Sequence, residues 1–348
     1  MKAAPREDLR PYLARLRELP FVEEARLKTP PPSQDDRHWN ALLELRVAGK
    51  RRRYLIAHQQ TARLNYALVE NLIGRTRQGP EAKWIFFTPY VTSPMAAYLM
   101  QRGVNYVDAN GNCSLTIDRD HVAVIDGRRP VHRLEDARLA GRAGYRVYFA
   151  LLARPRLVEK TVREIAEDTG VSKTVVAVIM RRLEGEGIIA RTRTKAIIIR
   201  PTALLDRWLA GYTDNLRPRL LIGYYRTLDR EPADLEKRIE RALTQGEPTR
   251  WAWGGAAAAY RLTKHYRGQE TILHLEHPPV DLVQRLGLLP ARTGPLALLR
   301  VPGPLAFDGA VPNTVHPLLI YTELLAAGDD RAREAAAEIR DQYLDYLV

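Results

Sequence analysis

The stretch TVREIAEDTGVSKTVVAVIMRRLEGEG, residues 161–187, decides how the middle of the chain folds. Thr161 and Glu164 have the spacing of a capping box, in which each side chain accepts a hydrogen bond from the other residue's backbone amide. Gly170 is expected to end this short helix, and a longer helix is expected over 173–186. The pattern therefore predicts two helices that are joined by a tight turn.

The flanking residues extend this pattern on both sides. A helix over 145–152 precedes it, and two apolar strands, 188–190 and 196–199, follow it around the polar tip 191–195. This order of elements is that of a winged helix-turn-helix over 144–200. In such a unit the turn holds the third helix away from the core, so that the helix can enter a major groove of DNA.

Helical spacing divides the 173–186 helix into two faces. Val176, Ile179 and Leu183 fall on the face expected to be buried. The side chains expected to face a DNA groove are Ser172, Lys173, Thr174, Ala177, Val178 and Arg181. At the wing, Arg191, Arg193 and Lys195 are expected to contact phosphates or a minor groove. The alternative is a winged helix that serves only dimerisation or peptide contact.

The distribution of charge supports contact with a polyanion. The chain has 348 residues, with 54 Lys and Arg against 41 Asp and Glu, a net charge of +13. Residues 127–200 carry +9 of this excess, residues 1–126 carry +5, and residues 201–348 carry −1. A localised basic block predicts binding to nucleic acid, although a solvated basic face is the other interpretation.

Composition excludes several classes of protein. No apolar run reaches the roughly 18 residues of a membrane span, and the first residues lack the apolar core of a secretory signal, so we expect a cytoplasmic protein. Cys113 is the single cysteine, which excludes an internal disulfide, a CxxC zinc site and an iron–sulfur cluster. His274 and His277 would point to opposite faces of a strand. We therefore expect no metal and no cofactor.

The first 126 residues alternate helix and strand signals. Helices are expected over 11–19, 62–73 and 93–101, and strands over 42–47, 54–58, 83–87, 104–107, 114–117 and 122–125. Such an alternation predicts an α/β or α+β domain with a mixed sheet. The order of elements is similar to that of nucleases of the PD-(D/E)XK type.

Nuclease chemistry of this type needs carboxylates that hold magnesium and a lysine beside them. If the strand 54–59 is aligned by its apolar residues, Ala57 and Gln59 occupy the positions of the glutamate and the lysine. Glu44 on the preceding strand has no evident partner. We therefore expect a nuclease-like domain without catalysis, and a magnesium-dependent nuclease guided by the winged helix is the alternative.

The remaining residues, 201–348, predict a further α/β domain. Helices are expected over 202–211, 233–243, 255–266, 316–326 and 329–347, and strands over 270–275 and 295–301. Gly254 and Gly255 open a helix before a strand, as in nucleotidyltransferases, but the strand offers Glu276 and no Asp-x-Asp pair. The glycine pair is then a turn or a packing device.

We expect this nearly neutral region to serve protein contacts. One stripe of the last helix consists of Ala335, Ile339, Gln342 and Tyr343, beside Leu344 and Leu347. The stripe could hold a second copy of the chain, or it could pack onto its own domain.

Three stretches carry a resemblance to a known family. They are FFTPYVTSPMAAYLMQRGVNYVDANGNCSL (86–115), YRLTKHYRGQETILHL (260–275) and VHPLLIYTELLAAGDDRAREAAAEI (315–339). Together with the winged helix they resemble AbiEi-type antitoxins of type IV toxin–antitoxin systems. The resemblance implies a DNA-binding transcriptional regulator that represses its own operon, and a nucleotidyltransferase-like toxin as partner. Simpler antitoxins of this type begin with the winged helix, whereas here a nuclease-like domain of about 126 residues precedes it.

The sequence thus predicts a multidomain α/β and α+β protein. Its predicted parts are a nuclease-like domain (1–126), a linker (127–143), a winged helix-turn-helix (144–200) and a C-terminal α/β domain (201–348), which is nucleotidyltransferase-like. A homodimer on palindromic double-stranded DNA is the usual geometry for such a unit. An architectural factor, for instance in the replication of a mobile element, is a further alternative.

Overall fold

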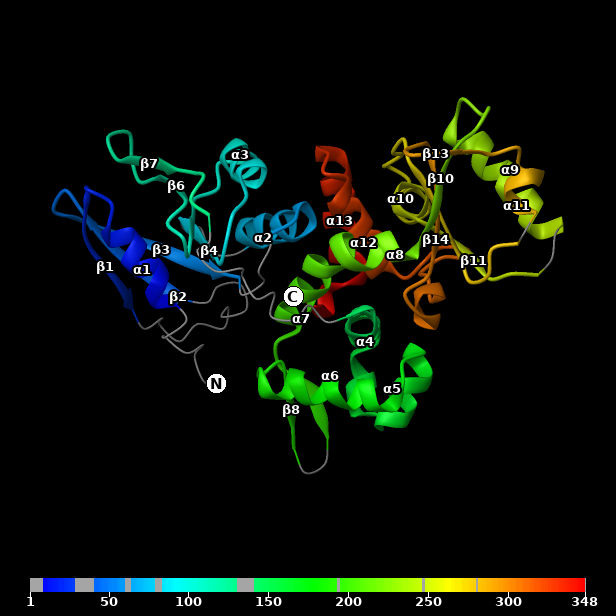
Figure 1. Cartoon of the computed structure of the whole chain (residues 1–348), viewed down its shortest axis with the longest axis horizontal. Helices are drawn as coiled ribbons and strands as arrows, with labels where there is room; N and C mark the ends of the chain where they lie inside the picture. Colours follow the sequence, from blue (N-terminus) through cyan, green and yellow to red (C-terminus); the bar gives the residue numbers. More distant parts are fainter. Residues whose placement is uncertain are drawn as a thin grey trace. The chain divides into compact units, whose positions relative to one another are not determined.

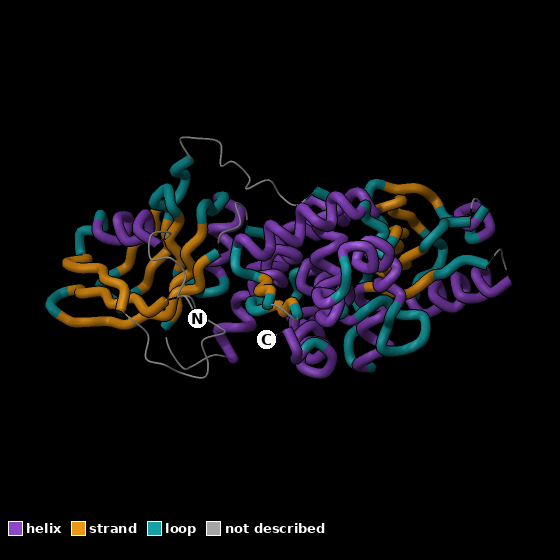
Figure 2. The backbone as a smooth tube through the Cα atoms, turned by 90° about the horizontal axis from the view of Figure 1, so that it is seen from below, coloured by secondary structure: helices purple, strands orange, loops and turns teal. Residues whose placement is uncertain are grey.

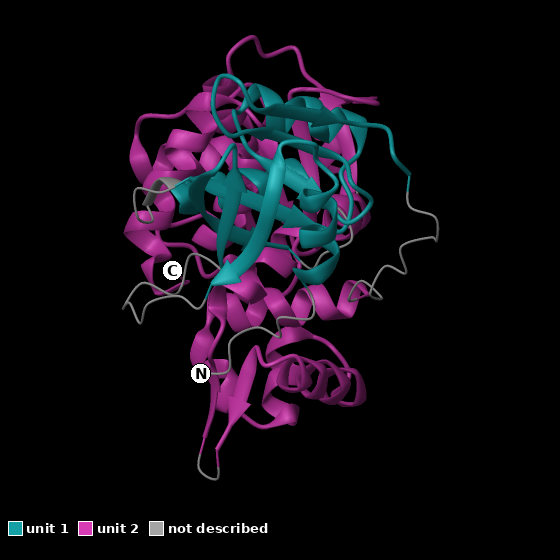
Figure 3. Ribbon diagram, turned by 90° about the vertical axis from the view of Figure 1, so that its left-hand side faces the viewer, with its two compact units in different colours: residues 1–139 teal, residues 140–348 magenta. Residues whose placement is uncertain are grey.

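The computed structural model describes residues 9–28, 41–59, 64–78, 83–129, 141–192, 195–245, 248–279 and 281–347. The chain forms two compact units, 1–139 and 140–348, coloured separately in Figure 3. Their boundary lies inside the predicted linker. The predicted winged helix and C-terminal domain both lie in the second unit, and the division between them stays a prediction. No helix in the described ranges is long and apolar enough to cross a membrane.

The first unit is a seven-stranded mixed sheet whose strands follow one another in chain order (Figures 1 and 2). The strands are β1 (Val22–Lys28), β2 (Ala41–Val47), β3 (Lys50–His58), β4 (Trp84–Thr88), β5 (Tyr106–Asp108), β6 (Cys113–Thr116) and β7 (Val122–Ile125). The pairs β3–β4 and β4–β5 are parallel, and the others are antiparallel. Parallel neighbours need crossover connections, which α2 (Tyr66–Gln78) and α3 (Ser93–Gln101) provide. The predicted mixed sheet is confirmed.

One face of the antiparallel strands β1–β3 is covered by α1 (Arg10–Arg17). The ring of Tyr12 stacks on Phe87 with 4.8 Å between centroids, and Leu16 is fully buried. The apolar strand residues on this face are Ala25, Leu43, Leu45, Val47, Tyr54 and Ile56. Because side chains alternate along a strand, charged residues of β1–β3 are directed to the opposite face. The sequence did not predict β1, since only every second or third residue of VEEARLK is apolar.

The residues that replace the nuclease motif are buried. Ala57 is 4% exposed and Gln59 is 5% exposed. Glu44 pairs with basic groups rather than with a second carboxylate: its carboxylate lies 3.7 Å from Lys28 Nζ and 3.7 Å from Arg53 Nε. Its partners are thus basic, as expected for a carboxylate on a charged sheet face. The nuclease-like assignment itself stays a prediction.

The second unit begins with three helices and a hairpin. These are α4 (Arg142–Ala153), α5 (Val162–Thr169), α6 (Lys173–Gly185), and the antiparallel strands β8 (Ile189–Arg191) and β9 (Ala196–Ile198). A 3-10 turn, Pro155–Glu159, joins α4 to α5. After the hairpin come α7 (Pro201–Gly211), a π-helical turn (Tyr212–Leu216) and the short helix α8 (Arg217–Leu220).

A second sheet follows, in the order β11 (Trp251–Gly254), β12 (Thr271–Leu275), β14 (Leu296–Arg300), β10 (Leu221–Arg226) and β13 (Leu289–Ala291). The helices around it are α9 (Pro232–Gln245), α10 (Gly255–Thr263), α11 (Leu282–Arg285), α12 (Pro317–Ala327) and α13 (Asp330–Tyr343). The predicted helix 255–266 ends early, because Lys264 adopts a left-handed conformation (φ 65°). The predicted helix 329–347 ends at Tyr343, and residues 345–347 form a separate 3-10 turn.

The glycine pair before α10 is a packing device. A Cβ atom on Gly254 would lie 2.8 Å from the ring of His274, and one on Gly255 (φ +48°) would lie 2.8 Å from Ile272 Cδ1. Neither position has room for a side chain, so the pair lets α10 approach β12 closely. This confirms one of the two interpretations given above.

The stripe on the last helix packs within its own unit. Ala335 is 5% exposed and Ile339 is fully buried, while Leu344 and Leu347 are 1% and 2% exposed. Their apolar surface is therefore already covered by the same chain. Gln342 is exposed and Tyr343 is half-buried, so the apolar members of the stripe favour packing onto their own domain, and contact with a second copy stays a prediction.

Candidate DNA-binding site

The turn between α5 and α6 is built as the sequence predicts. The backbone N of Glu164 donates to Thr161 Oγ1 at 3.3 Å, and the backbone N of Thr161 donates to Glu164 Oε2 at 2.8 Å. The hydrogen bonds that the backbone N and the hydroxyl of Thr161 donate to its carboxylate lower the pKa of Glu164 to about 2. Gly170 ends α5 in the left-handed conformation (φ 61°), which turns the chain toward α6.

The buried face of α6 is confirmed. Val176 and Leu183 are fully buried and Ile179 is 8% exposed. Met180, which the spacing did not single out, is buried beside them. These side chains fix the rotation of the helix about its axis, which determines the residues that face outward.

The outward face carries small, apolar and basic side chains. Ser172, Lys173, Thr174 and Arg181 are exposed, and Ala177 is half-buried. Val178 is 53% exposed, and Val175, which the sequence analysis did not include, is 38% exposed. Helical spacing alone could have placed Val175 on this outward face, since it does not fall on the face of Val176, Ile179 and Leu183. Arg181 Nε donates to the carbonyl of Ala177 at 3.3 Å, so the guanidinium lies along the helix.

The β8–β9 hairpin has a basic rim. Arg191 Nε lies 2.9 Å from Glu184 Oε1 of α6, which joins the hairpin to this helix. At the tip, the backbone N of Thr192 donates to the carbonyl of Lys195 at 2.8 Å, and the Lys195 side chain is exposed. Arg193, the third predicted wing residue, lies outside the described residues. Arg191 and Lys195 are thus placed near α6, and Arg191 already has an acidic partner.

Aromatic contacts and ion pairs join α4 to the rest of the second unit. The Phe149 ring packs on Trp208 of α7 at 5.3 Å between centroids, and Trp208 Nε1 donates to Thr322 Oγ1 at 2.8 Å. After α4, Arg154 Nη2 pairs with Asp308 Oδ2 at 2.9 Å. This connection could not be predicted from the sequence, because its partners are far apart in the chain.

Two family models match the second unit. Residues 143–204 match the sugar-specific transcriptional regulator TrmB. Residues 197–345 match the transcriptional regulator of the type IV toxin–antitoxin system described as AbiEi antitoxin. The chain is a DNA-binding transcriptional regulator. The TrmB match covers α4–α6, the β8–β9 hairpin and the start of α7.

The second match agrees with the resemblance drawn from residues 260–275 and 315–339. The first unit of the regulator lies outside both matches. No curated protein and no solved structure matches the chain.

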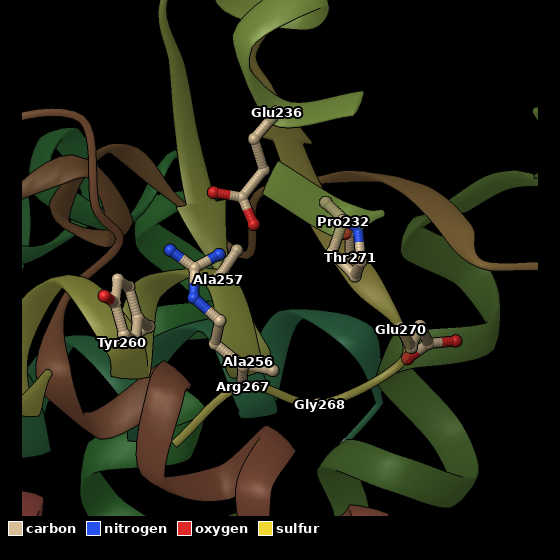
Figure 4. A pocket seen from close by; sticks show the side chains of 9 residues that line it. All are labelled: Pro232, Glu236, Ala256, Ala257, Tyr260, Arg267, Gly268, Glu270 and Thr271. Atoms are coloured by element: carbon tan, nitrogen blue, oxygen red, sulfur yellow. The ribbon is translucent and has the colours of Figure 1, made fainter. Parts of the chain in front are cut away.

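A small pocket lies beside α10 in the C-terminal part of the regulator (Figure 4). Its cavity is about 10 Å³, which is room for about one water molecule. Glu236 pairs with Arg261 at 2.7 Å, and Arg267 lies 3.6 Å from the centre of the Tyr260 ring. The size of the pocket does not suit a nucleotide, and the partner of the Glu236 carboxylate is an arginine.

A buried charge network lies near the π-helical turn. Tyr212 donates to Glu323 Oε1 at 2.5 Å, and Arg217 Nε lies 2.9 Å from Glu323 Oε2. Burial, followed by the Glu323 carboxylate, raises the pKa of Tyr212 well above its ordinary value. Burial is the largest single influence on Arg217 and opposes its charge, but Glu323, Tyr212 and Tyr224 together outweigh it and raise the pKa of Arg217. These groups satisfy one another, and they fix α8 to α12.

Proposed function

We propose that α4–α6 and the β8–β9 hairpin form a winged helix-turn-helix that recognises a specific operator. In this arrangement the N-terminal end of α6 enters the major groove, where Lys173 and Thr174 meet base edges. The exposed Lys195 contacts phosphate. The observation that supports this proposal most directly is the α5–α6 turn, which leaves the N-terminal end of α6 exposed. This turn lies in the segment that matches a transcriptional regulator family.

We further propose that the regulator is an antitoxin that represses its own operon. The match over 197–345 supports this role, and a nucleotidyltransferase-like toxin is the partner that it implies. A homodimer on an inverted repeat suits a unit with one recognition helix per chain. The nearly neutral charge of residues 201–348 is consistent with a surface for protein contacts.

We propose no catalytic activity. In the first unit, the positions of the nuclease glutamate and lysine are occupied by the buried Ala57 and Gln59. In the second unit, the strand that follows the glycine pair has no Asp-x-Asp. In the part of the chain that the structure describes, no group of three or more His, Cys, Asp or Glu residues could hold a metal ion.

Selection of bound duplexes from a random pool tests the operator proposal. The full-length protein should enrich one inverted repeat, with half-site centres about one helical turn, ~34 Å, or a multiple of it apart. The repeat should also occur upstream of the gene itself. A pool without enrichment after several rounds would contradict sequence-specific reading, and a single unrepeated site would contradict the dimer.

A further inference from the structure

The exposed face of β1–β3 in the first unit is rich in arginine. The strand register aligns Arg26, Glu44 and Arg53 in one row across the three strands. A second row contains Glu24, Arg46 and Arg51. Neighbouring strands lie about 4.8 Å apart, so Arg46 and Arg51 are adjacent in the second row, whereas Arg26 and Arg53 flank Glu44 in the first. We call the basic residues Arg26, Lys28, Arg46, Arg51 and Arg53 the arginine face.

Arg26 and Arg53 lie outermost on this face, and the Glu44 carboxylate lies beneath them. The Arg53 side chain is 73% exposed and the Arg26 side chain is 66% exposed, whereas the Glu44 side chain is 11% exposed. Glu24 pairs with Arg26, and Glu23 pairs with Arg46 at 2.9 Å. Five basic groups against the three acidic groups leave a surplus of positive charge, and an approaching partner meets guanidinium groups first.

A hollow adjoins the arginine face. Its volume is about 620 Å³, and it is lined by Glu44, Arg51, Arg52, Arg53, Lys83, Ile117 and Asp118. Arg52 Nη2 lies 3.3 Å from Asp118 Oδ2, and Lys83 Nζ donates to the carbonyl of Ile117 at 3.1 Å. The cations are therefore held in position on strands rather than on long loops, and positioned donors lose less entropy on binding.

This hollow is distinct from the nuclease-like position. Arg51 to Arg53 stand at the beginning of β3, and Lys83 precedes β4. Ala57 and Gln59, which replace the nuclease motif, stand at the other end of β3. Because β3 and β4 are parallel, both basic segments lie at the same end of the sheet.

We propose that the arginine face and its hollow bind the phosphate backbone of duplex DNA, as a second contact in addition to that of α6. The planar guanidinium group donates two parallel hydrogen bonds to a phosphate, and it is more weakly hydrated than an ammonium group. We choose duplex DNA as the ligand because the chain is a DNA-binding regulator, so its function already brings it to a duplex. The contact carries no sequence information, since backbone contacts fix position rather than base identity.

Salt-dependent binding tests this contact. Fluorescence anisotropy would measure the affinity of full-length R51Q/R53Q for a 40-bp duplex of arbitrary sequence at several salt concentrations. Each lost phosphate contact should reduce the slope of log K against log salt by about 0.9, so we expect a reduction of about 1.8. The matched control is R10Q/R17Q, which removes the same charge from α1 on the opposite face of the sheet. Its slope should equal that of the wild type.

Several outcomes would overturn the proposal. A slope of R51Q/R53Q equal to that of the control would do so, provided that circular dichroism shows both variants folded. A slope that changes on single-stranded RNA but not on the duplex would assign the face to a different ligand. The experiment is independent of operator reading: Thr174→Ala should reduce the preference for the selected site, whereas R51Q/R53Q should weaken all duplexes equally.

Discussion

The hydroxyl of Tyr346 donates a hydrogen bond to the carbonyl oxygen of Leu152 at 3.1 Å, which joins the last turn of the chain to the end of α4. The same turn buries Leu347, at 2% exposure. The helix that supports α5 and α6 is thereby held by residues almost two hundred positions later. The proposed DNA-binding elements and the C-terminal part should therefore unfold together.

Replacement of Phe149 by alanine tests this coupling. Phe149 is 1% exposed and packs on Trp208, so the cavity should lower the free energy of unfolding by about 3–5 kcal/mol. Urea unfolding that is followed by tryptophan fluorescence and by circular dichroism should give one coincident transition for the second unit. Val178→Ala, on the exposed face of α6, should change stability by no more than about 0.5 kcal/mol. Separate transitions for α4–α6 and the C-terminal part would contradict the coupling.

The proposed reading helix and wing should respond differently to substitution. Arg181→Ala should cost about 1–3 kcal/mol on the selected operator and little on a scrambled duplex, because a base contact is lost. Lys195→Gln should weaken both duplexes equally and reduce the salt slope by about 0.9, because a phosphate contact is lost. Titrations at four salt concentrations would measure both effects. If neither variant changes affinity on any duplex, these elements do not contact DNA.

The absence of nuclease activity is a direct test of the first unit. Supercoiled plasmid incubated with the protein and Mg²⁺ or Mn²⁺ should stay supercoiled, since Ala57 and Gln59 replace the metal-binding carboxylate and the charge-stabilising lysine. Gel electrophoresis reports nicking and linearisation. Cleavage that disappears in Glu44→Ala would show that Glu44 acts in catalysis in spite of its basic neighbours. Cleavage that persists in this variant would indicate a contaminating nuclease.

Stability should fall between pH 6.5 and pH 4. Burial lowers the pKa of His316 to about 4 and that of His274 to about 4, below the unfolded value of about 6.5. The unfolded chain therefore binds more protons in this window, so the free energy of unfolding decreases as pH falls. The maximal contribution is about 3 kcal/mol for each histidine at pH 4. Urea unfolding at half-unit pH steps would measure it.

The His316→Asn variant provides the matched control. His316 Nδ1 accepts a hydrogen bond from the backbone N of Leu318 at the start of α12. Asparagine is also a favourable N-cap residue, but it does not titrate. We therefore expect the pH dependence of stability to decrease by about half, since His274 remains. An unchanged dependence would contradict the role of His316.

Local signals predicted the segment around α6 well. The capping box at Thr161 and the three apolar residues of α6 depend on neighbours within four positions, so one turn of helix is enough to detect them. The strand β1 was not predicted because its sequence is rich in charged residues, and only pairing with β2 places those residues in a sheet. Without β1, the rows that form the arginine face could not be recognised from RRR at 51–53. The contacts of α4 with α7 and α12 likewise depend on residues that only the fold brings together.

The ion pair between Arg191 and Glu184 sets a condition on how the wing can meet DNA. A phosphate that approaches Arg191 must replace a carboxylate that already lies 2.9 Å away. The exchange of one anion for another yields less free energy than the capture of a solvated cation by phosphate, and it leaves Glu184 facing the negative duplex. Glu184 thus competes with every nucleic acid that the wing encounters. This competition lowers the affinity for nonspecific DNA. At a site where α6 also makes base contacts, those contacts can compensate for it.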